Sequence, residues 1–95
     1  MPVEQISVVS LASHQGPRVQ LAAYGTAERA QAGWAEIKPQ LGGIESGHDA
    51  VIEEAILESG TFYRLQIGYF DTALAARDFC DQVLTLRLDC IIIPF

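Results

Sequence analysis

The segment VQLAAYGTA (residues 19–27) occurs a second time, in outline, as LQIGYFDTA (residues 65–73). Gln, Thr and Ala recur in place at a constant offset of 46 residues. In each copy the residues alternate as in a half-buried strand; in the first copy Val19, Leu21 and Ala23 form one side and Gln20, Ala22 and Tyr24 the other. A threonine then stands where a helix N-cap belongs. Each copy therefore predicts a strand, a turn and a helix.

An amphipathic, alanine-containing helix is expected after each threonine. The first helix spans about residues 27–38, because Pro39 cannot donate a backbone hydrogen bond and clashes one turn back. Trp34 lies on its apolar stripe and is expected in the core. The second helix spans about residues 73–86 and also carries its apolar residues on one face.

The remaining strands lie between and after the two copies. Glycine-rich breakers precede residues 50–58, which are rich in β-branched and aliphatic residues, and Ser59-Gly60-Thr61 predicts a hairpin to a strand at residues 62–68. A last strand is expected at residues 90–93. The order βαββαβ with right-handed crossovers predicts an α+β, ferredoxin-like (RNP-like) fold, in which a four-stranded antiparallel sheet carries both helices on one face.

The 95 residues are enough for one domain with a single core. Residues 18–95 are expected to form that domain. Residues 1–17 are interpreted as a linker or N-terminal extension, and the alternative is an additional edge strand within residues 6–12.

Charge, the length of apolar runs and the residues after the first strand argue against several classes of function. Six Lys and Arg against twelve Asp and Glu give a net charge of -6, opposite to that of a protein that binds nucleic acid. No apolar run approaches the roughly 20 residues that span a bilayer, so direct membrane insertion by these residues is not expected. An enzyme of acylphosphatase type would need an arginine-bearing anion cradle after the first strand, which Tyr24-Gly25-Thr26 does not provide.

No metal, cofactor or catalytic site is expected. His14, His48, Cys80 and Cys90 lack the spacing of metal ligands. Ser46, His48 and Asp49 share one glycine-flanked loop, which is a poor support for a fixed chain of catalytic hydrogen bonds.

Two neighbouring acidic residues, Glu53 and Glu54, point to opposite faces of their strand and cannot act together on one substrate. We interpret both as surface charges.

The sheet face opposite the helices is the candidate site. By alternation it collects Gln20, Phe62, Arg64, Gln66 and Ile91, with Ile93 as a further candidate. Amides donate and accept hydrogen bonds, an aromatic ring stacks on a sugar, and a guanidinium holds a carboxylate with two bonds. The face is either such a binding platform or an ordinary solvated sheet surface.

The two cysteines face the same layer. Cys80 lies on the apolar side of the second helix, and Cys90 should point from the last strand toward it. In an oxidising compartment a disulfide closing this short loop would stabilise the fold by about 3 kcal/mol; in a reducing compartment both remain core thiols.

Two parts of the chain resemble a known family. They are the strand VQLAAY (residues 19–24) with its Thr-capped helix, and FYRLQIGYF (residues 62–70) with a second helix that ends before Asp89-Cys90. Over Val19 to Ile93 the chain resembles a SPOR domain, and its Cys80 and Cys90 pair is similar to that of SPOR domains from proteobacterial envelope proteins. Two positions depart from the family pattern: Ala22-Ala23 replace Gly-Ser, and Gly68-Tyr69-Phe70 replaces Gly-Pro-Phe.

The resemblance implies a non-catalytic module that binds peptidoglycan glycan strands lacking stem peptides. Such strands carry lactyl carboxylates and accumulate at division septa, so the module would target its parent protein to the septal cell wall. It implies a location in the periplasm or cell envelope, within an anchored or exported protein. Carried over by position, the site residues are Gln20, Phe62, Arg64 and Ile91.

The alternative function is a protein–protein interaction or dimerisation module that buries the same open face. The expected state is a monomer, with a weak dimer as the alternative.

Overall fold

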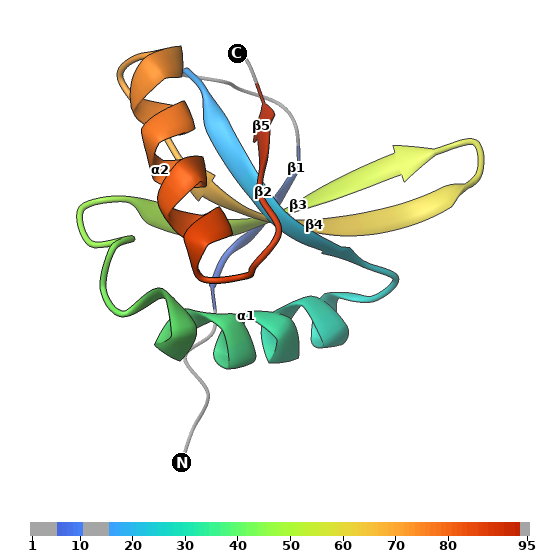
Figure 1. Ribbon diagram of the computed structural model, residues 1–95. Coiled ribbons are helices and arrows are strands. Elements are labelled where there is room, and N and C mark those ends of the chain that lie inside the picture. The colour runs from blue at the N-terminus through green and yellow to red at the C-terminus, as the bar shows by residue number, and fades with distance from the viewer. Residues whose placement is uncertain (1–5, 11–15, 94–95) are drawn as a thin grey trace.

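A computed structural model describes residues 6–10 and 16–93 of the chain (Figure 1). Its elements are β1 (Val8–Ser10), β2 (Arg18–Tyr24), α1 (Ala27–Leu41), β3 (Asp49–Leu57), β4 (Gly60–Gly68), α2 (Ala73–Thr85) and β5 (Ile91–Ile93). None of the helices in these ranges is long and apolar enough to cross a membrane.

The predicted α+β class is confirmed. The strands β3, β4, β2 and β5 lie in this order and each pairs antiparallel with its neighbour, as a βαββαβ topology requires. Within the described residues the sheet nevertheless has five strands and is mixed, because β1 adds to the outer edge of β3 in parallel. The expectation of four strands was one too few.

The alternative expectation for the N-terminal stretch, an additional edge strand within residues 6–12, corresponds to β1. Val8 lies opposite Ile52 in the sheet. The side chain of Gln31 in α1 holds the backbone of Ile6, accepting from its N–H at 3.0 Å and donating to its carbonyl at 2.8 Å. Strand β1 thus pairs with backbone groups at the edge of β3 that would otherwise be exposed, and Gln31 pairs with those of Ile6. Where the domain begins along the chain stays a prediction, and His14 lies outside the described residues.

Both helices begin as predicted. Thr26 and Thr72 have extended backbones, and their hydroxyls accept from the N–H of Arg29 at 3.1 Å and of Ala75 at 3.0 Å. The predicted end of the first helix was wrong, because α1 continues through Pro39 to Leu41. A proline in the last turn removes one hydrogen bond only, and Gly42, with φ of 65°, ends the helix in the left-handed conformation.

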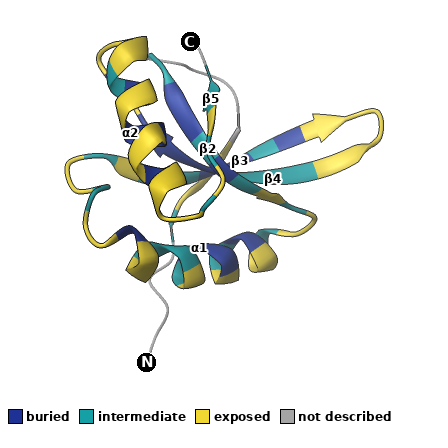
Figure 2. Cartoon of the chain, viewed as in Figure 1, coloured by how far each residue is buried: buried dark blue, intermediate teal, exposed yellow. Residues whose placement is uncertain are grey.

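The core lies between the two helices and one face of the sheet (Figure 2). The predicted burial of Trp34 is confirmed, as its side chain is 2 % exposed. The helices contribute Ala30, Trp34, Ala76, Phe79 and Val83 to the core, and the strands contribute Val19, Leu21, Ile52, Leu65 and Ile67. These strand residues point toward the helices, so the residues that alternate with them face the other way.

A β-bulge at Leu21 interrupts the alternation of β2. Gln20 pairs with Gln66, but Ala22 pairs with Leu65, so the strand carries one extra residue. Beyond the bulge Ala23 pairs with Arg64 and is exposed, and Tyr24 packs against the core. The predicted grouping of Ala23 with Val19 and Leu21, and of Tyr24 with Gln20, was therefore wrong beyond the bulge.

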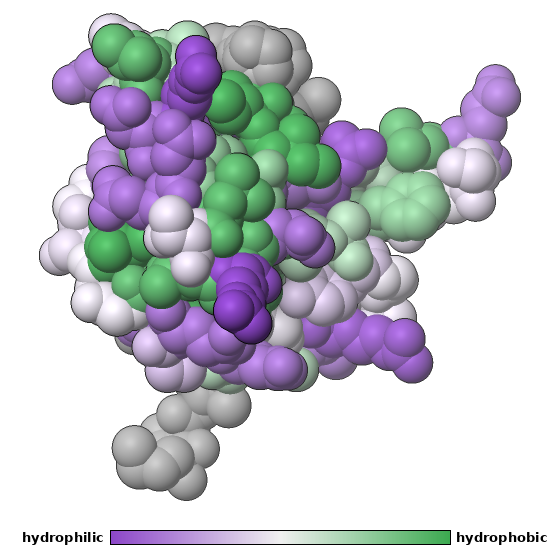
Figure 3. All heavy atoms as spheres, viewed as in Figure 1, coloured by the Kyte–Doolittle hydropathy of each residue, from purple (hydrophilic) through white to green (hydrophobic). Residues whose placement is uncertain are grey.

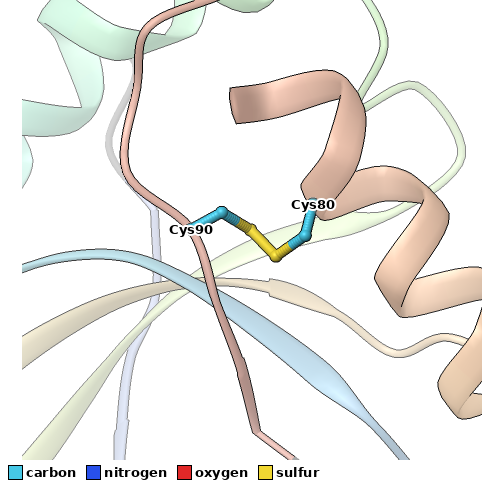
Figure 4. The surroundings of a disulfide bond; sticks show 2 residues. All are labelled: Cys80 and Cys90. Atoms are coloured by element: carbon cyan, nitrogen blue, oxygen red, sulfur yellow. A yellow bond between two sulfur atoms is a disulfide. The ribbon is translucent and has the colours of Figure 1, made fainter. Parts of the chain in front are cut away.

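A disulfide joins α2 to the segment that leads into β5 (Figure 4). Cys80 and Cys90 are separated by 10 residues in the sequence and by 5.4 Å between their Cα atoms. Because β5 pairs with β2 through only three residues, this bond is a main attachment of the edge strand to the domain.

Candidate functional site

The strand register brings the predicted site residues to one face of the sheet. Gln20 of β2 lies between Ile91 of β5 and Gln66 of β4. Arg64 lies between Ala23 of β2 and Glu53 of β3, and Phe62 lies opposite Ala55. Register partners point to the same side, so three neighbouring strands present Gln20, Phe62, Arg64, Gln66 and Ile91 together on the face opposite the helices. We call this surface the open face.

A groove of about 390 Å³ runs beside β2 at the edge of the open face. Gln20 and Ile91, both predicted site residues, line it. The other lining residues are Leu21, Ala22, Ala23, Leu84, Asp89 and Cys90. β5 pairs with β2 only from Arg18 to Gln20, so the groove follows a part of β2 whose outer edge has no strand partner among the described residues.

Apolar side chains surround this groove. Ile91 is 59 % exposed and Leu84 is 51 % exposed, although both are large aliphatic residues. In Figure 3 the corresponding apolar surface extends over the region where Figure 1 places β5, beside the more polar outer side of α2. Exposed apolar surface next to amide groups is suited to a ligand that has both apolar and polar faces, such as a sugar ring.

The predicted site residues differ in accessibility. The side chain of Arg64 is 32 % exposed, and Gln20 and Phe62 are half-buried. Gln66 is fully buried. Its position therefore does not support the expectation that Gln66 contacts a ligand directly. The side chain of Gln66 lies beneath the accessible residues of the open face.

A buried carboxylate organises the polar side chains of the open face. Glu53 is 2 % exposed, so our interpretation of it as a surface charge was wrong. One of its oxygens, Oε2, accepts from Nη2 of Arg18 at 3.2 Å. The other, Oε1, accepts from Nε2 of Gln66 at 3.3 Å and lies 3.5 Å from Nη1 of Arg64. Buried charge is tolerated when it is paired and hydrogen-bonded in this way.

The same network reaches Gln20. Nε2 of Gln66, besides donating to Glu53, lies 3.4 Å from Oε1 of Gln20. A chain of polar contacts therefore runs from Glu53 through Gln66 to a residue that lines the groove. We call the set Arg18, Glu53, Arg64, Gln66 and Gln20 the Glu53 network.

The carboxylate next in sequence has a different environment. Glu54 points to the opposite face and accepts a hydrogen bond from the Tyr63 hydroxyl at 3.1 Å. This hydrogen bond is the main cause that raises the pKa of Tyr63 above 10.0, and partial burial and the negative charges of Glu54 and Glu28 raise it further. Glu54 thus has no contact with the open face, which makes it a natural control for Glu53.

The described ranges, 6–10 and 16–93, contain no group of three or more His, Cys, Asp or Glu side chains placed to hold a metal ion. His48 instead stacks on Phe70 with 4.2 Å between ring centroids, and its Nδ1 lies 3.3 Å from the carbonyl oxygen of Tyr69. Its neighbours are thus an aromatic ring and a backbone oxygen.

Sequence reasoning missed Arg18 and Glu53. Arg18 is 3 % exposed, and its guanidinium lies 5.7 Å from the centre of the Tyr69 ring. It stands one residue before the repeated segment, where the alternation pattern gives no signal. The signal that could have found Glu53 is its pairing with Arg64, and this pairing depends on the length of the hairpin loop between β3 and β4.

The fold and the open face define a small α+β domain with two helices on one side of a mixed, mainly antiparallel sheet and a polar, partly apolar surface on the other. The family model described as SPOR domain matches residues 13–94, and the chain belongs to that family. SPOR domains are binding domains and not enzymes.

Two solved structures show the same fold. The SPOR domain of RlpA from Pseudomonas aeruginosa is similar with a TM-score of 0.62 and 15 % identity, over 84 % of this chain and all (100 %) of that one. The peptidoglycan-binding domain of the B. subtilis cell wall lytic enzyme CwlC is similar with a TM-score of 0.54 and 23 % identity, over 86 % of this chain and 92 % of that one. A comparison with curated protein sequences found no match.

Proposed function

We propose that this domain binds peptidoglycan, and specifically glycan strands that lack stem peptides, through its open face. Membership of the SPOR family and the similarity to a domain named for peptidoglycan binding support the general class of ligand. The observation that carries the proposal for this chain is the groove beside β2, where Gln20 and Ile91 lie together at the edge of the open face.

Each accessible residue has a role in this proposal. The Gln20 amide exchanges hydrogen bonds with hydroxyl and acetamido groups, and Ile91 and Phe62 cover the apolar faces of sugar rings. The exposed part of Arg64 receives a lactyl carboxylate, for which a guanidinium offers two parallel N–H donors. Ala22 and Ala23 contribute no hydroxyl, so a shallow groove with few polar contacts is consistent with micromolar affinity.

The proposal includes a cellular role. A domain that recognises strands without stem peptides would bring its parent protein to the septal cell wall during division, from the periplasmic or outer side of the membrane. The open face would then localise the parent protein, and any catalytic activity would belong to other parts of that protein.

The experiment is retention on purified peptidoglycan sacculi, with and without amidase treatment that removes stem peptides. We expect retention of the wild-type domain to rise after amidase treatment. Gln20→Ala and Arg64→Ala should each reduce retention several-fold, whereas Arg77→Ala, which removes an exposed arginine from α2, should not.

A lack of retention on both kinds of sacculi would contradict the proposal. An increase in mass with concentration in sedimentation equilibrium would then favour the alternative, a dimerisation module that buries Ile91 and Phe62 between two copies. Retention that is equal before and after amidase treatment would leave peptidoglycan as the ligand and reject the specificity for strands without stem peptides.

A further inference from the structure

The strongest unexplained feature of the open face is a buried negative charge next to a site proposed to bind an anionic polymer. Glu53 is 2 % exposed and lies on β3, opposite Arg64 of β4. A carboxylate at this position would repel an anionic ligand if neighbouring positive groups did not neutralise its charge. The contacts of Glu53 identify these groups.

Glu53 holds two arginines. Its Oε2 holds Arg18, which is nearly inaccessible, and its Oε1 lies 3.5 Å from Nη1 of Arg64, which is 32 % exposed. With one carboxylate and two guanidinium groups, this part of the network has a net charge of +1, in a chain whose net charge is -6. The accessible share of that positive charge belongs to Arg64.

Glu53 also orients the amide that lines the groove. It accepts from Nε2 of Gln66, and the same nitrogen lies 3.4 Å from Oε1 of Gln20. This contact uses the oxygen of Gln20 and directs its NH₂ group elsewhere, which fixes one of the two amide orientations.

We propose that Glu53 is the positioning residue of the open face, holding Arg64 directly and Gln20 through Gln66 in the places from which they meet the ligand. The inference rests on the proposed function and deepens it. Glu53 itself touches no ligand, and its effect on binding passes through the two residues that do. Preorganisation of this kind strengthens binding because fewer side-chain rotamers are lost on association.

The test is a double-mutant cycle with soluble glycan fragments released from amidase-treated sacculi, measured by calorimetry. Glu53→Gln keeps the shape and removes the charge, and we expect it to weaken binding about tenfold, as a lost hydrogen bond to a charged group does. In an Arg64→Ala background the same change should weaken binding less than about threefold, because the residue that Glu53 holds directly is already absent and only the route through Gln66 to Gln20 remains. Glu54→Gln is the matched control, since it removes the neighbouring carboxylate on the other face and should leave binding unchanged.

A second variant covers the case in which Glu53→Gln does not fold, which circular dichroism and thermal denaturation would reveal. Gln66→Met removes the link between Glu53 and Gln20 without changing the charge, and should weaken binding in the wild type but not in a Gln20→Ala background. Loss of affinity that is equal in both backgrounds, in either cycle, would show a purely structural role and overturn the inference.

The outcomes separate this inference from the proposed function. If the wild-type domain binds and a folded Glu53→Gln domain binds with the same affinity, the positioning role alone is rejected. Absence of binding by the wild-type domain, in the same calorimetric titration, rejects both.

Discussion

Gly33 allows α1 to lie against Tyr24 at the end of β2. A Cβ added at this position would overlap the hydroxyl and ring of Tyr24. We therefore expect Gly33→Ala to lower the free energy of unfolding by about 1–3 kcal/mol, as overpacking of a core does, although alanine is the better helix former. Urea denaturation measures the effect.

The control for this prediction is Gly25→Ala. An added Cβ at Gly25 meets no atom within 4 Å, so the change should stay within about 0.5 kcal/mol. A Gly33→Ala variant as stable as the wild type would mean that Tyr24 moves aside without loss.

The hydrogen bond from Tyr63 to Glu54 predicts a loss of stability at high pH. Because it raises the pKa of Tyr63 in the folded state above 10.0, the unfolded chain loses the tyrosine proton first. The stability that this group contributes is complete below pH 10.0 and falls as pH rises through its folded-state pKa. We expect the urea midpoint to decrease between pH 8 and pH 11 by less in Tyr63→Phe than in the wild type. Equal decreases in the two proteins would refute the link.

The open face shows which side chains alternation alone can place. Gln20, Arg64 and Ile91 lie on the face that their positions predicted. Glu53 was misplaced because alternation gives the face of a residue and not its partners: the two-residue turn, Glu58-Ser59, pairs it with Arg64. A change in hairpin loop length alters every partner of the strand, and this register decides which charges meet.

At the scale of elements, the disulfide predicts how β5 depends on α2. The bond closes a short loop, with a sequence separation of 10 residues, and the chain-entropy model gives a stabilisation of about 3 kcal/mol. We expect the double variant Cys80→Ser, Cys90→Ser to lose about this amount in urea denaturation. A reducing agent should lower the stability of the wild type to the same value and leave the double variant unaffected. A wild type that is insensitive to reduction would contradict the prediction.

Element types were predictable where two local signals agreed. Each helix has both a threonine cap and an apolar stripe, and the structure begins both helices at the predicted residue. Strand β1 has three residues, too few for a periodic pattern, and it is held by β3 and by Gln31, which are distant in sequence. Pro39 failed as a signal because α1 accommodates it in its last turn, where it removes a single hydrogen bond.

At the scale of the whole molecule, net charge predicts how salt affects the encounter with the wall. The chain carries a charge of -6, and its radius of gyration is 12.7 Å. The screening length falls from about 30 Å at 0.01 M salt to about 8 Å at 0.15 M, so the repulsion between the whole molecule and a carboxylate-bearing glycan is screened over this range. We expect the association rate constant to rise with salt and the dissociation rate constant to change little.

Biolayer interferometry on immobilised glycan strands measures both rate constants. An N-acetylglucosamine oligomer without carboxylates is the control, and its association rate should not respond to salt. An association rate that falls with salt would mean that the local charge of Arg64 outweighs the charge of the rest of the molecule.

The repeated segment gives the sheet an approximate two-fold axis. Gln20 and Gln66 occupy equivalent positions in the two copies, and they are also direct partners between β2 and β4. Their surroundings differ, because Gln20 lines the groove with Ile91, whereas Gln66 is buried against Glu53. A sugar chain has two chemically different ends, and turning it end for end on this surface does not restore its contacts. The two halves of the domain thus have the same order of elements, and under the proposed function the differences between them would let the open face distinguish the two directions of a bound polymer.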